Sequence, residues 1–116
     1  MGSRDDTYCG INAATKTLLL GEPEAIKEAQ NIAKEVRERL PEVITPDMGY
    51  WDAATIAEAT LIAGDIDGAT DLYQQAVDLS PMEKASHQST FRSVKVLCDQ
   101  LGLSENQRQV LSAPFS

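Results

Sequence analysis

The sequence is poor in aromatic residues, which make up 5% of its 116 positions although 42% of them are hydrophobic. A core built from this chain must consist mainly of Ala, Leu and Ile side chains, which suit closely packed helices. No hydrophobic run approaches the ~18 residues that a membrane-spanning helix needs. No apolar signal segment follows the polar start at residues 1–6. We therefore expect a single-domain cytoplasmic protein that is not embedded in a membrane.

The chain also lacks the residue groupings that most catalytic and metal sites require. It has one histidine, His87, and two cysteines, Cys9 and Cys98, which lie far apart and make no CxxC motif. Its glycines fall singly and form no phosphate-binding loop. Serine triads, zinc sites and nucleotide loops are therefore unsupported. We expect no enzyme activity, no catalytic or metal-binding residues, no cofactor, and two reduced thiols.

Positive charge is missing from the middle of the chain. Residues 40–83 contain nine acidic residues and no Lys or Arg, and the whole chain carries a net charge of −8. This balance argues against nonspecific binding to nucleic acid and against docking on anionic membranes.

Apolar spacing and helix-end residues predict helices along most of the chain. We expect helices at about 8–20, 23–40, 50–63, 66–79, 85–101 and 105–111. Gly21, Gly64 and Gly102 close the first, third and fifth of these, and Asp65 and Ser104 cap the helices that follow. Residues 1–6 are expected to be disordered or tag-derived, residues 7–112 to form the helical domain, and residues 113–116 to be a tail.

The segment 50–81 is typical of the end of a tetratricopeptide repeat. Ala69, Tyr73 and Ala76 have the expected small–aromatic–small spacing, and Pro81 stands where the helix must stop. A second copy of the pattern lies 43 residues earlier, because this offset pairs Gly21 with Gly64. We therefore predict an all-α, tetratricopeptide-like superhelix of about two and a half stacked hairpins.

A stack this short has poorly covered ends, so we expect self-association or a position within a larger protein. A short apolar strip near the end of the chain would contribute to self-association. It comprises Val110, Leu111 and Phe115.

In stacked hairpins the first helix of each repeat lines the concave face. Helical spacing places Trp51, Thr55 and Glu58 in one stripe on this face. The equivalent stripe one repeat earlier comprises Tyr8, Asn12, Thr15 and Leu19. The stripes have two interpretations: packing at the repeat junction, or a platform with aromatic surfaces and hydrogen-bonding groups for a ligand.

Arg92 and Lys95 share one face of the helix predicted at 85–101 and are cations within reach of the acidic middle of the chain. They either neutralise that segment or form an anion site at the end of the groove. We include both as candidate ligand-binding residues.

Two sequence strings resemble a known family: DTYCGINAA at residues 6–14 and YWDAATIAEA at residues 50–59. They are similar to the TRAF-binding, tetratricopeptide-like region of the apoptosis signal-regulating kinases and to its bacterial relatives, the TPR-S domains. The resemblance covers about residues 5–103. It implies a regulatory scaffold, in bacteria one that senses nucleotide-derived, particularly NAD-derived, signals for an attached effector. The family's motif positions fall here on Tyr8, Gly10, Asn12, Trp51, Thr55 and Glu58.

Two functions follow as alternatives. One is a sensor whose concave face holds a nucleotide-like molecule, with Tyr8, Asn12, Trp51, Thr55 and Glu58 as its lining and Arg92 or Lys95 at its edge. The other is a protein-interaction module that uses the same face for a peptide or a partner helix.

Overall fold

The computed structural model describes residues 13–39 and 49–115. Every regular element in these ranges is helical and none is a strand, which confirms the all-α prediction. Residues 13–19 form the first described helix. The elements that follow are α2 (Pro23–Arg39), α3 (Tyr50–Ile62), α4 (Ile66–Leu79), α5 (Lys84–Leu101), α6 (Glu105–Ser112) and the short 3₁₀ helix η1 (Ala113–Phe115).

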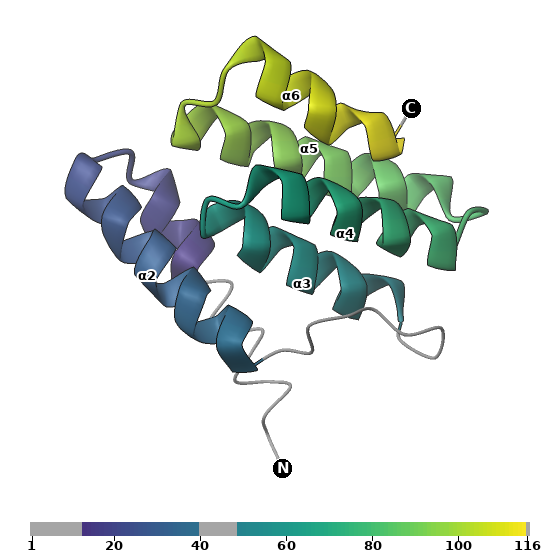
Figure 1. Ribbon diagram of the computed structural model, residues 1–116, viewed down its shortest axis with the longest axis horizontal. Helices are drawn as coiled ribbons and strands as arrows, with labels where there is room; N and C mark the ends of the chain where they lie inside the picture. Colours follow the sequence, from purple (N-terminus) through teal and green to yellow (C-terminus); the bar gives the residue numbers. More distant parts are fainter. Residues whose placement is uncertain (1–12, 40–48, 116) are drawn as a thin grey trace.

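The helices end where their glycines and capping residues predict. Gly21, Gly64 and Gly102 have φ angles of 76°, 102° and 67°, the left-handed conformation that closes a helix with little strain only at glycine. The Asp65 carboxylate accepts a hydrogen bond of 3.0 Å from the backbone N–H of Gly68 and so caps α4. Because the loop at Gly64 is tight, α3 and α4 form a hairpin (Figure 1).

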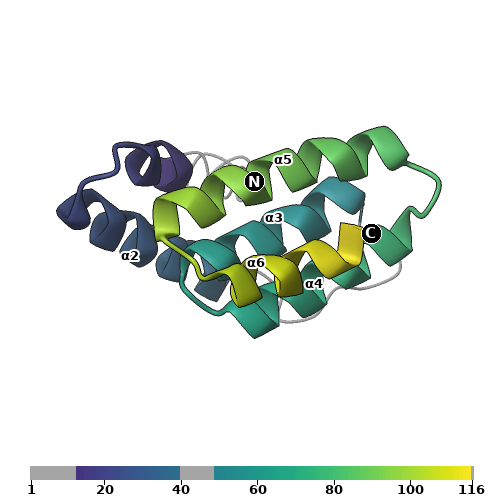
Figure 2. The same cartoon turned by 90° about the horizontal axis from the view of Figure 1, so that it is seen from above.

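α3 lies at the centre of the molecule, between α2, α4 and α5 (Figures 1 and 2). Ten of its thirteen residues are buried. Its sequence, YWDAATIAEATLI, has small or apolar side chains on every side, so neighbouring helices approach it closely from several directions. The helix therefore has almost no solvent-facing stripe.

The outer helices each bury one face and leave the other to solvent. In α2 the buried residues Ala25, Ala29, Ala33 and Val36 follow helical spacing and form its apolar face. Ile26 is partly buried against the core. The predicted end of this helix at Leu40 lies outside the described residues.

The end of the chain packs against the domain instead of leaving it as a tail. The Phe115 ring stacks on Phe91 at 5.2 Å and lies 5.5 Å from the Tyr73 ring. Leu111 is fully buried. Of the three residues expected to form an exposed apolar strip, only Val110 is exposed, at 43%. The strip therefore offers little apolar surface for self-association.

Candidate functional site

Trp51 is a half-exposed aromatic side chain at the start of α3, with 52% of its surface accessible. Its ring meets the neighbouring Tyr50 edge to face at 5.2 Å. Tyr50 is buried and held firmly, because its hydroxyl donates a 2.8 Å hydrogen bond to Thr90 Oγ1 on α5. The His87 ring lies 5.4 Å from Tyr50. Trp51 thus exposes an aromatic surface, and the Tyr50 side chain that it contacts is held in place by α5.

Thr55 does not present its hydroxyl to a groove. The side chain is 9% exposed, and Oγ1 donates a 2.8 Å hydrogen bond to the backbone oxygen of Trp51 in the same helix. This bond satisfies the hydroxyl's donor within α3. Thr55 therefore fits the packing interpretation of its stripe better than the ligand-binding one.

Glu58 lies at the junction between α3 and the helix of residues 13–19. Its Oε1 accepts a 2.9 Å hydrogen bond from Thr15 Oγ1. Burial raises the pKa of the Glu58 carboxyl, and the hydrogen bond from Thr15 acts in the opposite direction. A mostly buried carboxyl needs donors, and Thr15 supplies one of them from the neighbouring helix.

The equivalent stripe on the first predicted helix is described only in part. Tyr8, Asn12 and the motif residue Gly10 lie outside the described residues. Thr15, at the next position of that stripe, makes the bond to Glu58. Within the described residues, Thr15 of one stripe and Glu58 of the other therefore connect the helix of residues 13–19 to α3.

Arg92 and Lys95 are not brought to the α3 stripe. α5 bonds to α3 through Thr90, and Arg92 follows two residues later, about 200° around the helix. Lys95 Nζ lies over the Phe91 ring, 4.5 Å from its centroid. Lys95 also lines a cavity of about 370 Å³ between α5 and α6, together with Arg108. The predicted single site is thus divided between separate surfaces.

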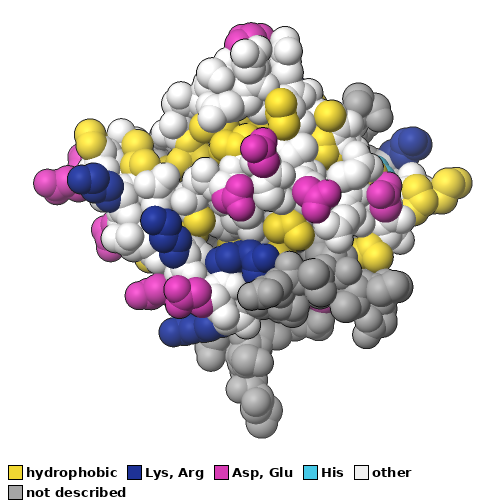
Figure 3. All heavy atoms as spheres, in the orientation of Figure 1, with side chains coloured by type: hydrophobic (Ala, Val, Ile, Leu, Met, Phe, Trp, Pro, Cys, Tyr) yellow, Lys and Arg dark blue, Asp and Glu magenta, His cyan; other side chains and the backbone are white. Residues whose placement is uncertain are grey.

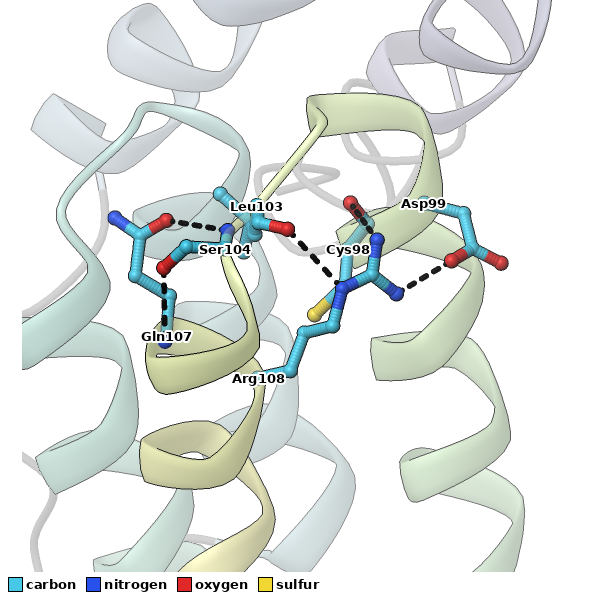
Figure 4. Close-up of polar contacts among 6 residues, drawn as sticks. All are labelled: Cys98, Asp99, Leu103, Ser104, Gln107 and Arg108. Atoms are coloured by element: carbon cyan, nitrogen blue, oxygen red, sulfur yellow. Dashed lines mark hydrogen bonds and ion pairs between the residues drawn. The ribbon is translucent and has the colours of Figure 1, made fainter.

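Sequence reasoning missed the polar joint between α5 and α6 (Figure 4). Arg108 Nη1 pairs with Asp99 Oδ1 at 2.5 Å, and Arg108 Nε donates to the Leu103 carbonyl at 3.1 Å. Ser104 and Gln107 form a reciprocal capping box at the start of α6. The Ser-x-x-Gln spacing was visible in the sequence and could have predicted this box.

Cys98 lies beside the same joint, 2% exposed and with a free thiol. Burial raises the pKa of the thiol, the nearby Arg108 lowers it, and burial is the larger effect. A buried thiol of this kind is a poor nucleophile, since the thiolate is the reactive form. Cys98 therefore serves the core.

The described parts of the chain contain no group of three His, Cys, Asp or Glu residues arranged to hold a metal ion. No helix within them is both long and apolar enough to span a bilayer. Comparison with known protein families, with curated proteins and with solved structures finds no match to this chain.

Proposed function

We propose that this chain is a non-catalytic helical scaffold that recognises a protein partner through Trp51 and the surface around it. The observation that carries the proposal is that Trp51 is half exposed while Tyr50, directly beside it, is buried and hydrogen-bonded to α5. Trp is among the residues most enriched at the positions that dominate the binding energy of protein interfaces. The other described residues of the stripe, Thr55 and Glu58, make contacts within the chain.

We further propose a tetratricopeptide-like stack for the whole chain. Gly21 and Gly64, 43 residues apart, both adopt the left-handed conformation at the end of a helix. Thr15 and Glu58, which are hydrogen-bonded, are separated by the same 43 residues. Corresponding positions of adjacent repeats meet in this way when equivalent helices lie side by side. The resemblance to TPR-S and TRAF-binding regions supports the same arrangement.

A small-ligand sensor is the second candidate, and Glu58 is the observation that favours it. A mostly buried carboxyl with a raised pKa is costly for a purely structural role and is common in binding sites. The resemblance implies a nucleotide-derived ligand, NAD-derived in particular, and an effector partner in bacterial signalling or immunity. In this account Trp51 would stack on the ligand base and Glu58 would accept hydrogen bonds from it.

The protein-interaction proposal is tested by capture with matched baits. Wild-type chain, Trp51→Ala and Val110→Ala are immobilised, and each captured protein is then purified and titrated against all three. Val110 is the control because it is apolar and 43% exposed but lies on α6 near Gly64, at the opposite end of α3 from Trp51. We expect a partner that loses affinity for Trp51→Ala and keeps it for Val110→Ala. A partner that binds all three variants equally would refute the role of Trp51.

A further inference from the structure

The outward face of α4 carries an acidic stripe. Its residues Asp67, Asp71, Gln74 and Asp78 are spaced i, i+4, i+7 and i+11, so they follow one side of the helix. All four are exposed, and Figure 3 shows acidic side chains in a row where α4 crosses the front of the molecule. Gln74 donates to Asp78 and Gln75 donates to Asp71, which orders the carboxylates without neutralising them.

The exposed side of α5 carries a cationic stripe of the same length. Lys84, Gln88, Arg92 and Lys95 are spaced i, i+4, i+8 and i+11, and all four are exposed. Each stripe therefore spans about 16 Å along its helix. The cationic stripe borders the cavity between α5 and α6, which Lys95 and Phe91 line.

The two stripes do not neutralise each other within one chain. Within residues 13–39 and 49–115 an ion pair forms between Arg108 and Asp99. Neither of these residues belongs to a stripe. Lys95 rests on the Phe91 ring of its own helix. The charges of both stripes are therefore available to a partner.

The stripes are complementary when one is reversed against the other. Antiparallel alignment opposes charge to charge and amide to amide along the whole length, pairing Asp67 with Lys95, Asp71 with Arg92, Gln74 with Gln88, and Asp78 with Lys84. We propose that the acidic stripe of one copy of this chain docks on the cationic stripe of a second copy. Neither stripe contains Trp51, and this proposal does not depend on the proposed function.

The contact joins two different surfaces, so it is heterologous. Such contacts extend into chains or close into rings and do not stop at a simple two-fold dimer. Exposed ion pairs each contribute little, so the association is weak and should appear only at roughly 0.1–1 mM chain. Salt screens such pairs, so the association weakens when NaCl is raised from about 50 mM to about 500 mM.

Charge reversal with complementation tests the proposal. The first variant is Asp71→Lys/Asp78→Lys, and the second is Lys84→Glu/Arg92→Glu. All four replaced residues are exposed, and Asp78→Lys and Lys84→Glu also suit their helices, because Lys is favourable near the end of α4 and Glu near the start of α5. Sedimentation velocity across the concentration series measures association, and circular dichroism verifies folding. A third variant, Lys27→Glu/Lys34→Glu, makes the same change in net charge as the second variant at exposed positions of α2 and serves as its control.

Each reversed variant alone should associate at least about tenfold more weakly than wild type, because like charges then oppose each other. An equimolar mixture of the two should regain association, since each supplies the stripe that the other needs. The control should associate like wild type.

Other outcomes overturn the proposal. Stronger association of Asp71→Lys/Asp78→Lys would show that general repulsion, which the lower net charge relieves, governs the behaviour. A mixture that stays monomeric would show that the stripes do not pair. Wild-type chain that is monomeric at every concentration would exclude a second copy as the occupant of the stripes.

Discussion

α3 and α5 are neighbours joined by one buried hydrogen bond, yet they expose very different chemistry. Ten of the thirteen residues of α3 are buried, against four of the eighteen in α5. α3 is enclosed by α2, α4 and α5, so its polar side chains must find partners inside the protein. α5 is covered on one side only, and its charged residues remain at the surface. We therefore propose that recognition depends on exposed residues outside this packing, which are Trp51 at the start of α3 and the charged stripes of α4 and α5.

The largest contrast between the two helices should appear in truncations of their aliphatic side chains. Ile56→Ala in α3 should lower the free energy of unfolding by about 2–5 kcal/mol, because Ile56 is 1% exposed and leaves a cavity in the core. Val96→Ala in α5 should change it by less than about 0.5 kcal/mol, since Val96 is 45% exposed. Urea denaturation measures both. Equal effects would show that α3 is not the centre of the core.

The hydrogen bond between the helices provides a second contrast. Thr90→Val removes the acceptor of the buried Tyr50 hydroxyl and should cost about 1–3 kcal/mol. Tyr50→Phe should cost only about 1 kcal/mol, because the Thr90 hydroxyl keeps its bond to the Ser86 carbonyl. If both variants melt with the wild type, this bond does not hold α3 against α5.

Gly64 tests the hinge between α3 and α4. Because its φ angle is 102°, Gly64→Ala should cost about 1–2 kcal/mol. Gly49, at the start of α3, has φ −72° and provides the matched control. Gly49→Ala should be nearly neutral, and thermal unfolding compares the two. A tolerated alanine at Gly64 would contradict the left-handed hinge.

The smallest expected effect belongs to Glu58, and its sign depends on pH. Burial raises the pKa of this carboxyl, so the folded chain binds more protons than the unfolded chain between the two pKa values. The carboxyl therefore favours folding at low pH, and this contribution is lost as the pH rises through the folded-state pKa. Glu58→Gln should be more stable than wild type at pH 7.

That advantage should disappear as the pH falls below the ordinary pKa of a glutamate. Urea denaturation of both proteins at several pH values measures the difference. The exposed Glu35 provides the control, and Glu35→Gln should change stability little at any pH. A Glu58→Gln variant that is less stable at pH 7 would show that the charged carboxyl has a partner which contributes more than burial costs.

The sequence predicted the helices well because their ends depend on local chemistry. Gly21, Gly64 and Gly102 and the caps Asp65 and Ser104 act over a few residues, and all five lie where expected. The end of the chain was harder to predict. Phe115 packs on Phe91 and Tyr73, which lie far from it in the sequence. No local sequence pattern predicts such a contact.

The candidate site shows the same limit of local reasoning. Helical spacing correctly placed Thr55 and Glu58 on one side of α3, but it does not say what covers that side. The Thr55 hydroxyl bonds to its own helix, and Glu58 bonds to Thr15. Arg92 and Lys95 were grouped with α3 by their charge, whereas their side of α5 faces away from it.

The central claim is that the polar residues of α3 hold the helices together and leave Trp51 for a protein partner. Thermal unfolding of the chain with about 1 mM NAD, ADP-ribose or ATP tests it directly, because a ligand bound to the folded state raises Tm. Our account predicts an unchanged Tm with each compound. A rise in Tm that Glu58→Gln abolishes would contradict it and would make the small-ligand sensor the leading function.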